Sequence, residues 1–378
     1  MRSLLNTDLR GKCVLVRCDF NVPIEDGTIL DTTRIDASFK TIDYLLKRSD
    51  KVCLCSHLGS PKGRKDQNLS LRPVLSYLNR KYEIEFFEDY FPQLSKETLP
   101  KLSLLENLRF YPHEESNDDQ FSRFLAGLCD VYVNDAFSAS HRRHASIVGV
   151  CNYVSEKYPG FLLEMEVKAI NSALSNPARP LTILLGGLKV STKLPMISRL
   201  ASVADYILIG GAMANTFWVS QGIRMNECFF EESLVDEAGR ILAEASKAQI
   251  ILARDFVCSN GYECVTYPVD KIPPGFKNYD IGEETIRFFS AILEKSKTII
   301  WNGPLGVVEK DEFVVGTTAI VQKIAKCDCF KIAGGGDTVA FLNKLGMLYG
   351  FNYVSLAGGA FLEYLERGNL PGIEVLCC

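Results

Sequence analysis

The 378-residue chain lacks several features that would assign it to other broad classes of protein. No apolar run approaches the roughly 18 residues that span a bilayer, and the start, Met1 to Asp8, lacks the apolar core of a signal peptide. No run of Lys or Arg occurs, and the net charge is −4. These absences argue against a membrane protein, a secreted protein and a general nucleic-acid binder, and we expect a cytoplasmic protein.

Histidine is scarce, and two well-known nucleotide-binding patterns are missing. The chain has only four His, and none has a partner four residues away with a third ligand at metal spacing, which argues against a zinc site. Neither G-x-x-x-x-G-K-[ST] nor G-x-G-x-x-G occurs. A dinucleotide-dependent dehydrogenase remains an alternative function, because a fold alone does not determine what a protein does. The missing G-x-G-x-x-G pattern counts against it.

Cysteine, by contrast, is abundant, with 13 residues. Five of them lie in or beside apolar, strand-like runs: Cys13, Cys18, Cys53, Cys55 and Cys129. In a large chain of this kind they are interpreted as small buried hydrophobic side chains and not as disulfide partners. Cys377 and Cys378 end the chain, and two terminal cysteines are too little to indicate a lipid anchor.

Short apolar runs recur along the chain, most of them followed by a glycine-rich or polar turn and then by a helical pattern. They are residues 12–17, 51–55, 130–133, 181–185, 205–209, 249–252, 298–301, 330–333 and 352–355. Apolar runs with little alternation predict parallel strands that are covered on both faces. Because the chain is longer than one hydrophobic core usually supports, we predict two doubly wound α/β domains with a cleft between them.

A connecting helix is predicted between the two halves. Tyr158-Pro159-Gly160 breaks the chain, residues 161–174 place apolar side chains at helical spacing, and Asn176-Pro177 ends the pattern. We therefore predict a first domain over residues 1–157, a hinge helix over 158–175 and a second domain over 176–365.

In the first half, polar turns follow the predicted strands, at the edge where open α/β sheets bind ligands. The turns comprise residues 18–23, 56–63 and 134–137, and Arg34, Arg109 and Arg142 lie near them in the sequence. Arginine offers a fork of donors that suits carboxylate and phosphate, so the group predicts a site for a small anion. Each arginine alone is better explained by an exposed ion pair. For His57, a ligand contact and a backbone-bracing role both remain open.

In the second half, the turns are rich in glycine: Gly186-Gly187, Gly210-Gly211, residues 303–306, residues 334–338 and residues 357–360. A single glycine pair is usually just a tight turn. Their recurrence between strands and helices predicts a phosphate site made of backbone N–H groups, and a nucleotide is the simplest ligand.

Three charged residues in these turns are further candidates. Lys189 and Lys193 are four residues apart, so a helix beginning there would point both ammonium groups at phosphates, or would leave them on a solvated helix edge. Asp337 follows three glycines and is a candidate ligand for Mg²⁺; capping a helix together with Thr338 is the other possible role.

With its motifs in this order, the sequence resembles the phosphoglycerate kinase family along nearly its whole length. The motifs are V-R-C-D-F-N-V-P (16–23), D-T-T-R-I (31–35), S-H-L-G-S-P-K-G (56–63), E-N-L-R-F (106–110), V-N-D-A-F (133–137), H-R-R-H (141–144), W-N-G-P-L-G-V-V-E (301–309), G-G-G-D-T (334–338) and G-G-A (358–360). The resemblance implies reversible phosphoryl transfer between 1,3-bisphosphoglycerate and ADP, giving 3-phosphoglycerate and ATP, with Mg²⁺, by a monomer.

The resemblance also implies roles for individual residues. The first domain would bind 3-phosphoglycerate through Asp19, Asn21, Arg34, His57, Gly59, Ser60, Arg109 and Arg142. The nucleotide site would comprise Gly187, Lys189, Lys193, Gly211, Asn302, Pro304, Glu309, Gly335, Gly336, Asp337 and Thr338, with Asp337 toward the metal and Glu309 toward the ribose. The catalytic groups would be Arg34, Lys193, Gly335 and Gly359. Residues 366–378 would form a tail that returns to the first domain.

Several residues depart from the usual pattern of the family. Ser60 stands where the family usually has an Arg, Leu188 where it has a small residue, and Thr192 where it has an Asp. Ser138-Ala139-Ser140 replaces the usual Gly-Thr-Ala, Val308 replaces a Phe, and Leu356-Ala357 replaces Thr-Gly. These departures motivate an alternative, a catalytically silent homologue that binds nucleotide and serves as a scaffold. The presence of Arg34 and Lys193 counts against that alternative.

Overall fold

A computed structural model describes residues 1–245 and 247–377. The chain forms two compact units: one comprises Met1–Val167 together with the segment that begins at Asn369, and the other comprises Lys168–Gly368. The first boundary lies inside a single helix, α5 (Phe161–Leu174). Cys378, the last residue of the predicted tail, lies outside the described residues. Among those residues, no helix has the length and apolar character needed to cross a membrane.

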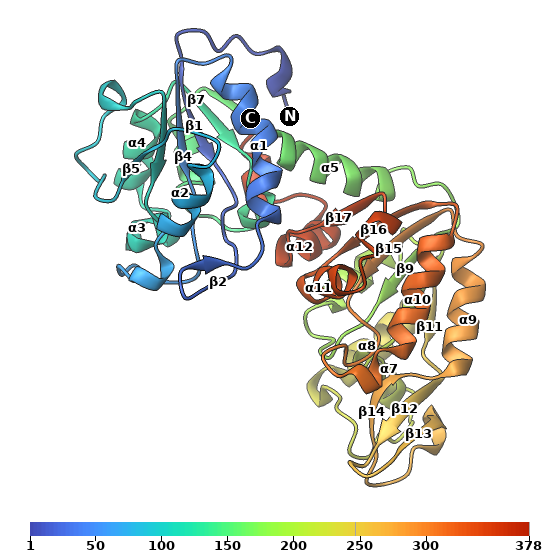
Figure 1. Cartoon of the computed structure of the whole chain (residues 1–378). Helices are drawn as coiled ribbons and strands as arrows, with labels where there is room; N and C mark the ends of the chain where they lie inside the picture. The colour runs from blue at the N-terminus through green and yellow to red at the C-terminus, as the bar shows by residue number, and fades with distance from the viewer. Residues whose placement is uncertain (246, 378) are drawn as a thin grey trace. The chain divides into compact units, whose positions relative to one another are not determined.

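The first unit is built on a six-stranded parallel sheet with the strand order β5-β6-β4-β1-β7-β8 (Figure 1). Its strands are β1 (Cys13–Arg17), β4 (Lys51–Cys55), β5 (Glu85–Phe87), β6 (Leu102–Leu105), β7 (Val131–Asn134) and β8 (Glu156–Pro159). A separate hairpin pairs β2 (Ile24–Glu25) with β3 (Thr28–Ile29). Every residue of β1, β6 and β7 is buried, as expected for parallel strands that are covered on both faces.

The helices of the first unit are α1 (Thr33–Leu46), α2 (Arg72–Leu78), α3 (Pro112–Glu115), α4 (Asp119–Gly127) and α13 (Pro371–Glu374). Helix α13 belongs to the segment that follows Asn369. The backbone of Gly372 in this helix donates a hydrogen bond to the carbonyl of Ser140 (2.8 Å) and accepts one from the Asn134 amide (3.3 Å). These two bonds fasten the end of the chain to the turn that follows β7.

The second unit contains another six-stranded parallel sheet, with the order β11-β10-β9-β15-β16-β17. Its strands are β9 (Leu181–Leu185), β10 (Tyr206–Ile209), β11 (Gln249–Leu252), β15 (Thr298–Asn302), β16 (Phe330–Gly334) and β17 (Tyr353–Ser355). A smaller antiparallel sheet has the order β13-β12-β14 and comprises β12 (Asp255–Ser259), β13 (Cys264–Pro268) and β14 (Lys277–Ile281).

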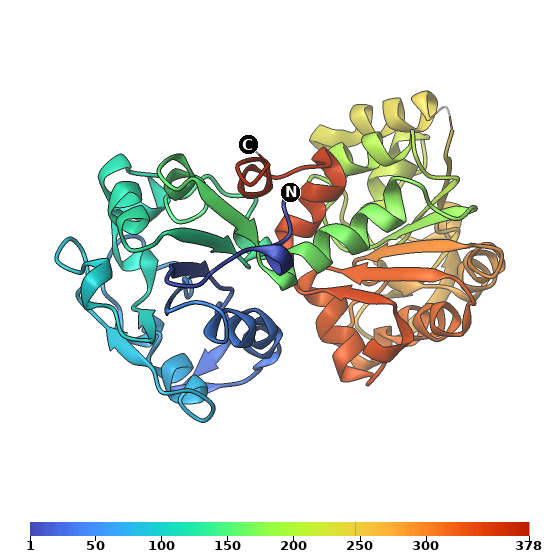
Figure 2. The ribbon, with the colours of Figure 1, turned by 90° about the horizontal axis from the view of Figure 1, so that it is seen from above.

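Helices cover both faces of the larger sheet of the second unit. They are α6 (Leu194–Leu200), α7 (Met213–Ser220), α8 (Val235–Glu244), α9 (Glu283–Leu293), α10 (Val315–Lys326), α11 (Gly336–Lys344) and α12 (Gly359–Arg367). Figure 2 shows the green-to-yellow helices α6, α7 and α8 on one side of the strands and the orange-to-red helices α9, α10 and α11 on the other. Both sheets are therefore doubly wound, which confirms the predicted fold class.

The order of the strands fixes where each unit can bind a ligand. In the first sheet the chain proceeds outward from β1 through β4 on one side and from β7 through β8 on the other. In the second sheet it proceeds from β9 to β11 on one side and from β15 to β17 on the other. At such a reversal the turns after the two central strands diverge and leave a crevice beyond their carboxyl ends. Binding sites are therefore expected beside β1 and β7, and beside β9 and β15.

The nine predicted strands agree with the structure to within one residue, but the prediction was incomplete. It missed β5, β6 and β8, the hairpin of β2 and β3, and the antiparallel sheet of β12, β13 and β14. Several of these strands are short or partly exposed. In β13 exposed and half-buried residues alternate, so it lacks the continuous apolar run by which the parallel strands were found.

The cysteines behave as small apolar side chains. All five cysteines assigned to buried positions from the sequence are buried, and the 12 cysteines in the described part of the chain are free thiols. Burial raises the pKa of the Cys53 thiol to about 12, so this group is neutral at physiological pH.

Candidate active site

In the first unit, an ion pair connects the turn after β1 with the start of α1. The Nη1 atom of Arg34 lies 3.1 Å from Oδ2 of Asp19 and 3.4 Å from the carbonyl oxygen of Asn21. The hydroxyl of Ser138 donates a second hydrogen bond to Oδ2 of Asp19, at 2.7 Å. Ser138 is one of the departures from the family pattern, and this bond gives it a definite place beside the candidate anion site.

The turn after β4 is tied to the same group. The amide side chain of Asn21 accepts a hydrogen bond from the backbone N–H of Gly59 (2.9 Å), and the carbonyl of Gly59 accepts one from Nη1 of Arg109 (2.7 Å). Arg109 is 5% exposed, and its Nε lies 3.3 Å from the Glu115 carboxylate. Burial lowers the pKa of Arg109 to about 10, with further contributions from Arg142 and Arg17. The guanidinium nevertheless keeps its charge at neutral pH.

The remaining three candidates of this unit differ in their exposure. His57 is 5% exposed, and burial holds its pKa well below the usual value, helped by several nearby arginines. Arg142 is exposed and donates from Nε to Nε2 of His141 at 3.3 Å, while its charge also acts on His57. Ser60 is exposed in the turn beside Gly59. The first unit thus gathers cations and polar groups at one edge of its sheet.

In the second unit, the turns after the two central strands touch each other. The N–H of Gly186 donates to the carbonyl of Asn302, the last residue of β15, at 3.0 Å. The turn after β10 joins them, because the N–H of Met213 donates to the carbonyl of Gly187 at 3.0 Å. A Cβ atom on Gly186 would lie 2.1 Å from the carbonyl oxygen of Pro304, which leaves no room for any side chain. Glycine is therefore required at this position for the two turns to meet.

The predicted helical start that would carry both Lys189 and Lys193 is wrong. Helix α6 begins only at Leu194, and the preceding residues form turns. Pro195 has no N–H to donate and is therefore tolerated only in the first turn of α6, so a helix that began near Lys189 would place this proline in its interior. The Ser191 N–H is instead held by the carboxylate of Glu231 at 2.8 Å.

As a result, the two lysines have different surroundings. Lys189 is exposed, whereas Lys193 is 7% exposed. The ammonium group of Lys193 donates a hydrogen bond to the carbonyl of Gly186 and lies 3.5 Å from the carbonyl of Asn302. Burial lowers the pKa of Lys193 to about 8, and the charge of Asp337 opposes this shift. Lys193 is therefore a buried cation beside the glycine turns.

The turn between β16 and α11 is shaped for close approach of a ligand. Gly335 has a φ angle of 106°, and a Cβ atom there would lie 2.5 Å from the side-chain amide of Asn302. The buried hydroxyl of Thr338 accepts a hydrogen bond from the N–H of Gly303 at 2.7 Å. Helix α11 has no side-chain cap, so Asp337 does not play the capping role considered from the sequence.

Two adjoining cavities in the second unit contain all the predicted nucleotide-binding residues. One has a volume of about 410 Å³ and is lined by Gly187, Lys189, Lys193, Asn302, Pro304, Gly335, Gly336, Asp337, Thr338 and Gly359, with Leu188 and Thr192 among the others. The second, of about 240 Å³, is lined by Gly187, Gly211, Pro304, Glu309 and Asp337, together with mostly apolar residues and with Asn278 and Asp280. Because the two share Gly187, Leu188, Pro304 and Asp337, they form a continuous site.

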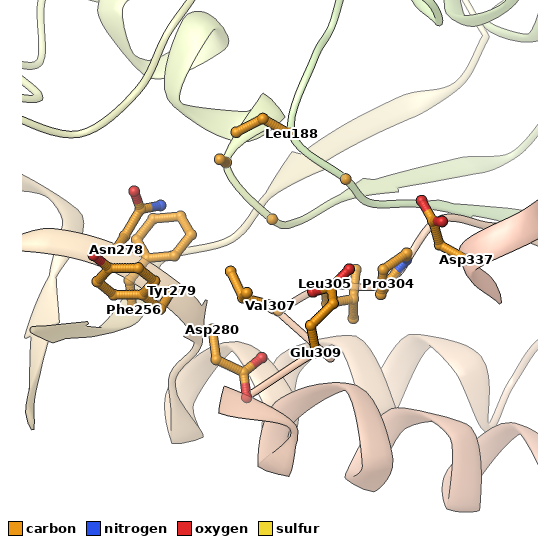
Figure 3. A pocket seen from close by; sticks show the side chains of 14 residues that line it. Leu188, Phe256, Asn278, Tyr279, Asp280, Pro304, Leu305, Val307, Glu309 and Asp337 are labelled. Carbon is orange, nitrogen blue, oxygen red and sulfur yellow. The ribbon is translucent and has the colours of Figure 1, made fainter. Parts of the chain in front are cut away.

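The apolar end of this site was not predicted from the sequence. Figure 3 shows Phe256, Asn278 and Tyr279 at one end of the second cavity, with Pro304 and Asp337 at the other. Phe256 belongs to β12, and the other two residues belong to β14. Their strands form the antiparallel sheet, so searching for turns after parallel strands could not find them. A cavity with aromatic walls that adjoins a cationic, glycine-lined one suits a base and its phosphates.

The residues present also fit a magnesium ion that arrives with a nucleotide. Asp337 is an exposed carboxylate in the first turn of α11 and lines both cavities. Across residues 1–245 and 247–377, no group of three or more His, Cys, Asp or Glu side chains could hold a metal alone. Magnesium commonly binds through one or two carboxylates, water and substrate phosphates, and Asp337 could supply such a carboxylate.

Together, the doubly wound sheets and the glycine-lined cavities with a buried lysine define a nucleotide-dependent phosphotransferase. The profile described as phosphoglycerate kinase matches residues 4–368. The chain belongs to the phosphoglycerate kinase family, and its function is the phosphoryl transfer of glycolysis.

Individual relatives agree with this assignment. The chain is 42% identical to the phosphoglycerate kinase of Desulfosudis oleivorans, over 100% of this chain and 98% of that protein. It is also 42% identical to that of Thermomicrobium roseum, with 100% and 99% covered. Among solved structures, phosphoglycerate kinase from Coxiella burnetii superposes with a TM-score of 0.91 at 35% identity, covering 100% of this chain and 98% of that one.

Proposed function

We propose that the polar edge of the first unit binds 3-phosphoglycerate and that the two adjoining cavities of the second unit bind the nucleotide together with Mg²⁺. The observation that carries this proposal is the position of Lys193, a buried cation on a cavity otherwise lined by glycine turns. The ammonium group has no carboxylate within salt-bridge distance in the described part of the chain, so a phosphate would supply its countercharge.

For phosphoryl transfer, a protein mainly has to position the two reacting substrates and to place positive charge around the phosphoryl oxygens. We assign Lys193 to the transferring phosphoryl group and Arg34 to the reacting carboxyl or acyl-phosphate end of the substrate. The N–H groups near Gly335 and Gly359 would take the remaining negative charge. A general base is not needed because the attacking group is already an anionic oxygen.

Magnesium, when bound, would neutralise charge on the nucleotide phosphates. We propose Asp337 as the protein ligand that helps to hold it. Glu309 lines the more apolar cavity and is exposed, which suits a hydrogen bond to the ribose hydroxyls.

The two substrates must meet for transfer to occur, and we propose that α5 acts as the hinge for this movement. Closure would also exclude water and so prevent wasteful hydrolysis of ATP. We further propose that the protein acts as a cytoplasmic monomer, with the final segment of the chain serving as a strap from one unit to the other.

Replacing Arg109 with alanine should raise the KM for 3-phosphoglycerate while leaving kcat within about twofold, because a phosphate anchor remote from the reacting carboxyl stabilises ground state and transition state similarly. Steady-state kinetics with varied 3-phosphoglycerate would measure this. Glu115→Ala is a suitable control, since it removes the carboxylate beside Arg109 and leaves the guanidinium in place. A fall in kcat with an unchanged KM would contradict the anchoring role of Arg109.

The substitution Ser60→Arg should lower the KM for 3-phosphoglycerate, most clearly at low ionic strength. Ser60 is exposed beside Gly59, whose carbonyl is bound by Arg109, so a new guanidinium would add positive charge to the anion site. The affinity for ADP should not change, because the nucleotide cavities belong to the second unit. A KM that stays constant or rises across a series of salt concentrations would show that Ser60 does not mark a vacant anion-binding position.

The pH dependence of kcat/KM should reflect the ionisation of Lys193. Because the pKa of this group is lowered to about 8, the charged form predominates below that pH and is lost as the pH rises through it. We therefore expect kcat/KM to fall above about pH 8, since this parameter reports ionisations of the free enzyme. Lys193→Arg should lack this decline, whatever its absolute rate, because arginine does not titrate there. A decline of the same position in Lys193→Arg would assign it to another group.

A further inference from the structure

Arg17, the last residue of β1, is a fully buried cation to which neither the sequence motifs nor the proposed mechanism assigned a role. The side chain is 0% exposed. A buried guanidinium is costly unless its donors are satisfied. Here Nε donates to the hydroxyl of Ser146 (2.9 Å), Nη1 donates to the carbonyl of Cys18 (2.6 Å), and Nη2 lies 3.0 Å from Nδ1 of His57.

The third contact determines where the proton of His57 lies. A guanidinium can only donate and stays charged in proteins, so Nδ1 of His57 must be the acceptor. A neutral imidazole with an accepting Nδ1 carries its hydrogen on Nε2. The ring is neutral because it is buried and surrounded by Arg17, Arg109 and Arg142, all of which lower its pKa. Within residues 1–245 and 247–377, no hydrogen bond engages Nε2 of His57.

A second layer of buried groups holds Arg17 in place. The hydroxyl of Ser146 accepts from Arg17 and donates to Oε1 of Glu114 at 2.6 Å, while the Ser146 N–H donates to Oε2 at 2.9 Å. Glu114 is 0% exposed, and although burial raises its pKa, the charge of Arg17 opposes that shift. Tyr132 donates to the Ser146 carbonyl at 2.6 Å. The guanidinium is therefore fixed in one orientation.

We propose that Arg17 is a positioning residue for the substrate, which holds His57 in the tautomer protonated on Nε2 so that this N–H can donate to an anionic oxygen of 3-phosphoglycerate. The inference rests on the proposed substrate site, where His57 is one of the contacts. It also selects between the two roles that the sequence left open for His57. A ring held this way presents a fixed neutral donor and not a titrating cation.

The tautomer can be measured directly on the full chain in the absence of substrate. Histidine-selective ¹⁵N labelling gives signals from only four residues, and His57→Gln identifies the signal of His57. We expect Nδ1 without hydrogen and Nε2 with hydrogen, and no titration between about pH 6 and 8. A hydrogen on Nδ1, or a His57 signal that titrates in this range, would overturn the proposal, and this result needs no Arg17 variant to fold.

The variant Arg17→Lys tests the link to the substrate. It keeps the charge but loses the planar fork, so we expect mixed tautomers of His57 and about a tenfold higher KM for 3-phosphoglycerate, with little change in kcat. The matched control is Ser49→Ala, which removes a buried hydrogen bond to the Leu45 carbonyl elsewhere in the same unit and should lower stability without moving either readout. The KM should also rise in His57→Gln, by a similar factor.

Two results would overturn the proposal in different ways. A raised KM in Arg17→Lys with the tautomer unchanged would mean that Arg17 affects substrate binding by a route other than the tautomer of His57. A changed tautomer with the KM unchanged would mean that His57 does not contact the substrate, which would contradict the proposed substrate site and not the arrangement of Arg17. Loss of the family's activity in the unsubstituted protein would be a separate failure, because the tautomer is measured without turnover.

Discussion

Lys193→Ala should lower kcat by about 10²-fold or more while changing the dissociation constant of the nucleotide little, because in the proposed mechanism the ammonium charge stabilises the phosphoryl group mainly in the transition state. The side chain is buried at the wall of the larger of the two cavities and bonded to the carbonyl of Gly186, whereas Lys189, the other lysine of that cavity, is exposed. Single-turnover kinetics together with a nucleotide titration would separate the chemical step from binding.

Lys189→Ala is the matched control for this experiment. Lys189 lines the same cavity and carries the same charge, but it is exposed, so its removal should mainly raise the KM for the nucleotide. If Lys193→Ala kept the kcat of the unsubstituted enzyme, the catalytic assignment of Lys193 would be wrong. Equal losses of kcat in both variants would show that burial does not distinguish the two lysines.

The second large effect is expected for Arg34→Ala, which should lower kcat/KM for 3-phosphoglycerate by about 10²- to 10³-fold, because a preorganised donor beside the reacting carboxyl is lost. In the structure Arg34 is held by Asp19 and by the carbonyl of Asn21. Its removal also leaves the buried carboxylate of Asp19 without this cation, which adds to the loss. Steady-state kinetics in both directions of the reaction would measure the effect.

Two variants sharpen the interpretation of Arg34. Arg34→Lys keeps the charge but not the fork, so it should recover only part of the activity. Arg72→Ala removes an arginine of the same unit that pairs with Glu88 and lies in an exposed setting, and it should change neither kcat nor KM appreciably. Full activity of Arg34→Ala would contradict the assignment of this residue to the reacting end of the substrate.

The sequence predicted most strands of the two parallel sheets well, because strands that are covered on both faces consist of continuous apolar runs. Residues 181–185 and 298–301, for example, form the central strands of the second sheet. The antiparallel strands were missed because β13 alternates between exposed and half-buried residues, and only a short 3-10 helix, Val269–Lys271, separates it from β14. Because these strands were not predicted, Phe256, Asn278 and Tyr279, which line the cavity of about 240 Å³, were not identified from the sequence.

For the candidate site, the sequence indicated which turns matter but not the state of each side chain. It named Lys189 and Lys193 as equivalent partners on a helix, whereas the turn before Pro195 buries one and exposes the other. It passed over Arg17 because a charged residue at the end of an apolar strand gives no sign of its partners. Ser146 lies 129 positions after Arg17, and Glu114 lies 32 positions before Ser146, so both are far from Arg17 in the sequence.

The most direct test of the central claim is a coupled assay of the purified full chain with 3-phosphoglycerate, ATP and Mg²⁺. We predict that ADP is released only when all three are present, that EDTA abolishes the reaction, and that Lys193→Ala reduces it by about 10²-fold or more. Nucleotide binding measured in parallel should be retained in that variant. A protein that binds nucleotide but releases no ADP above the level of Lys193→Ala would contradict the account and would favour a catalytically silent homologue.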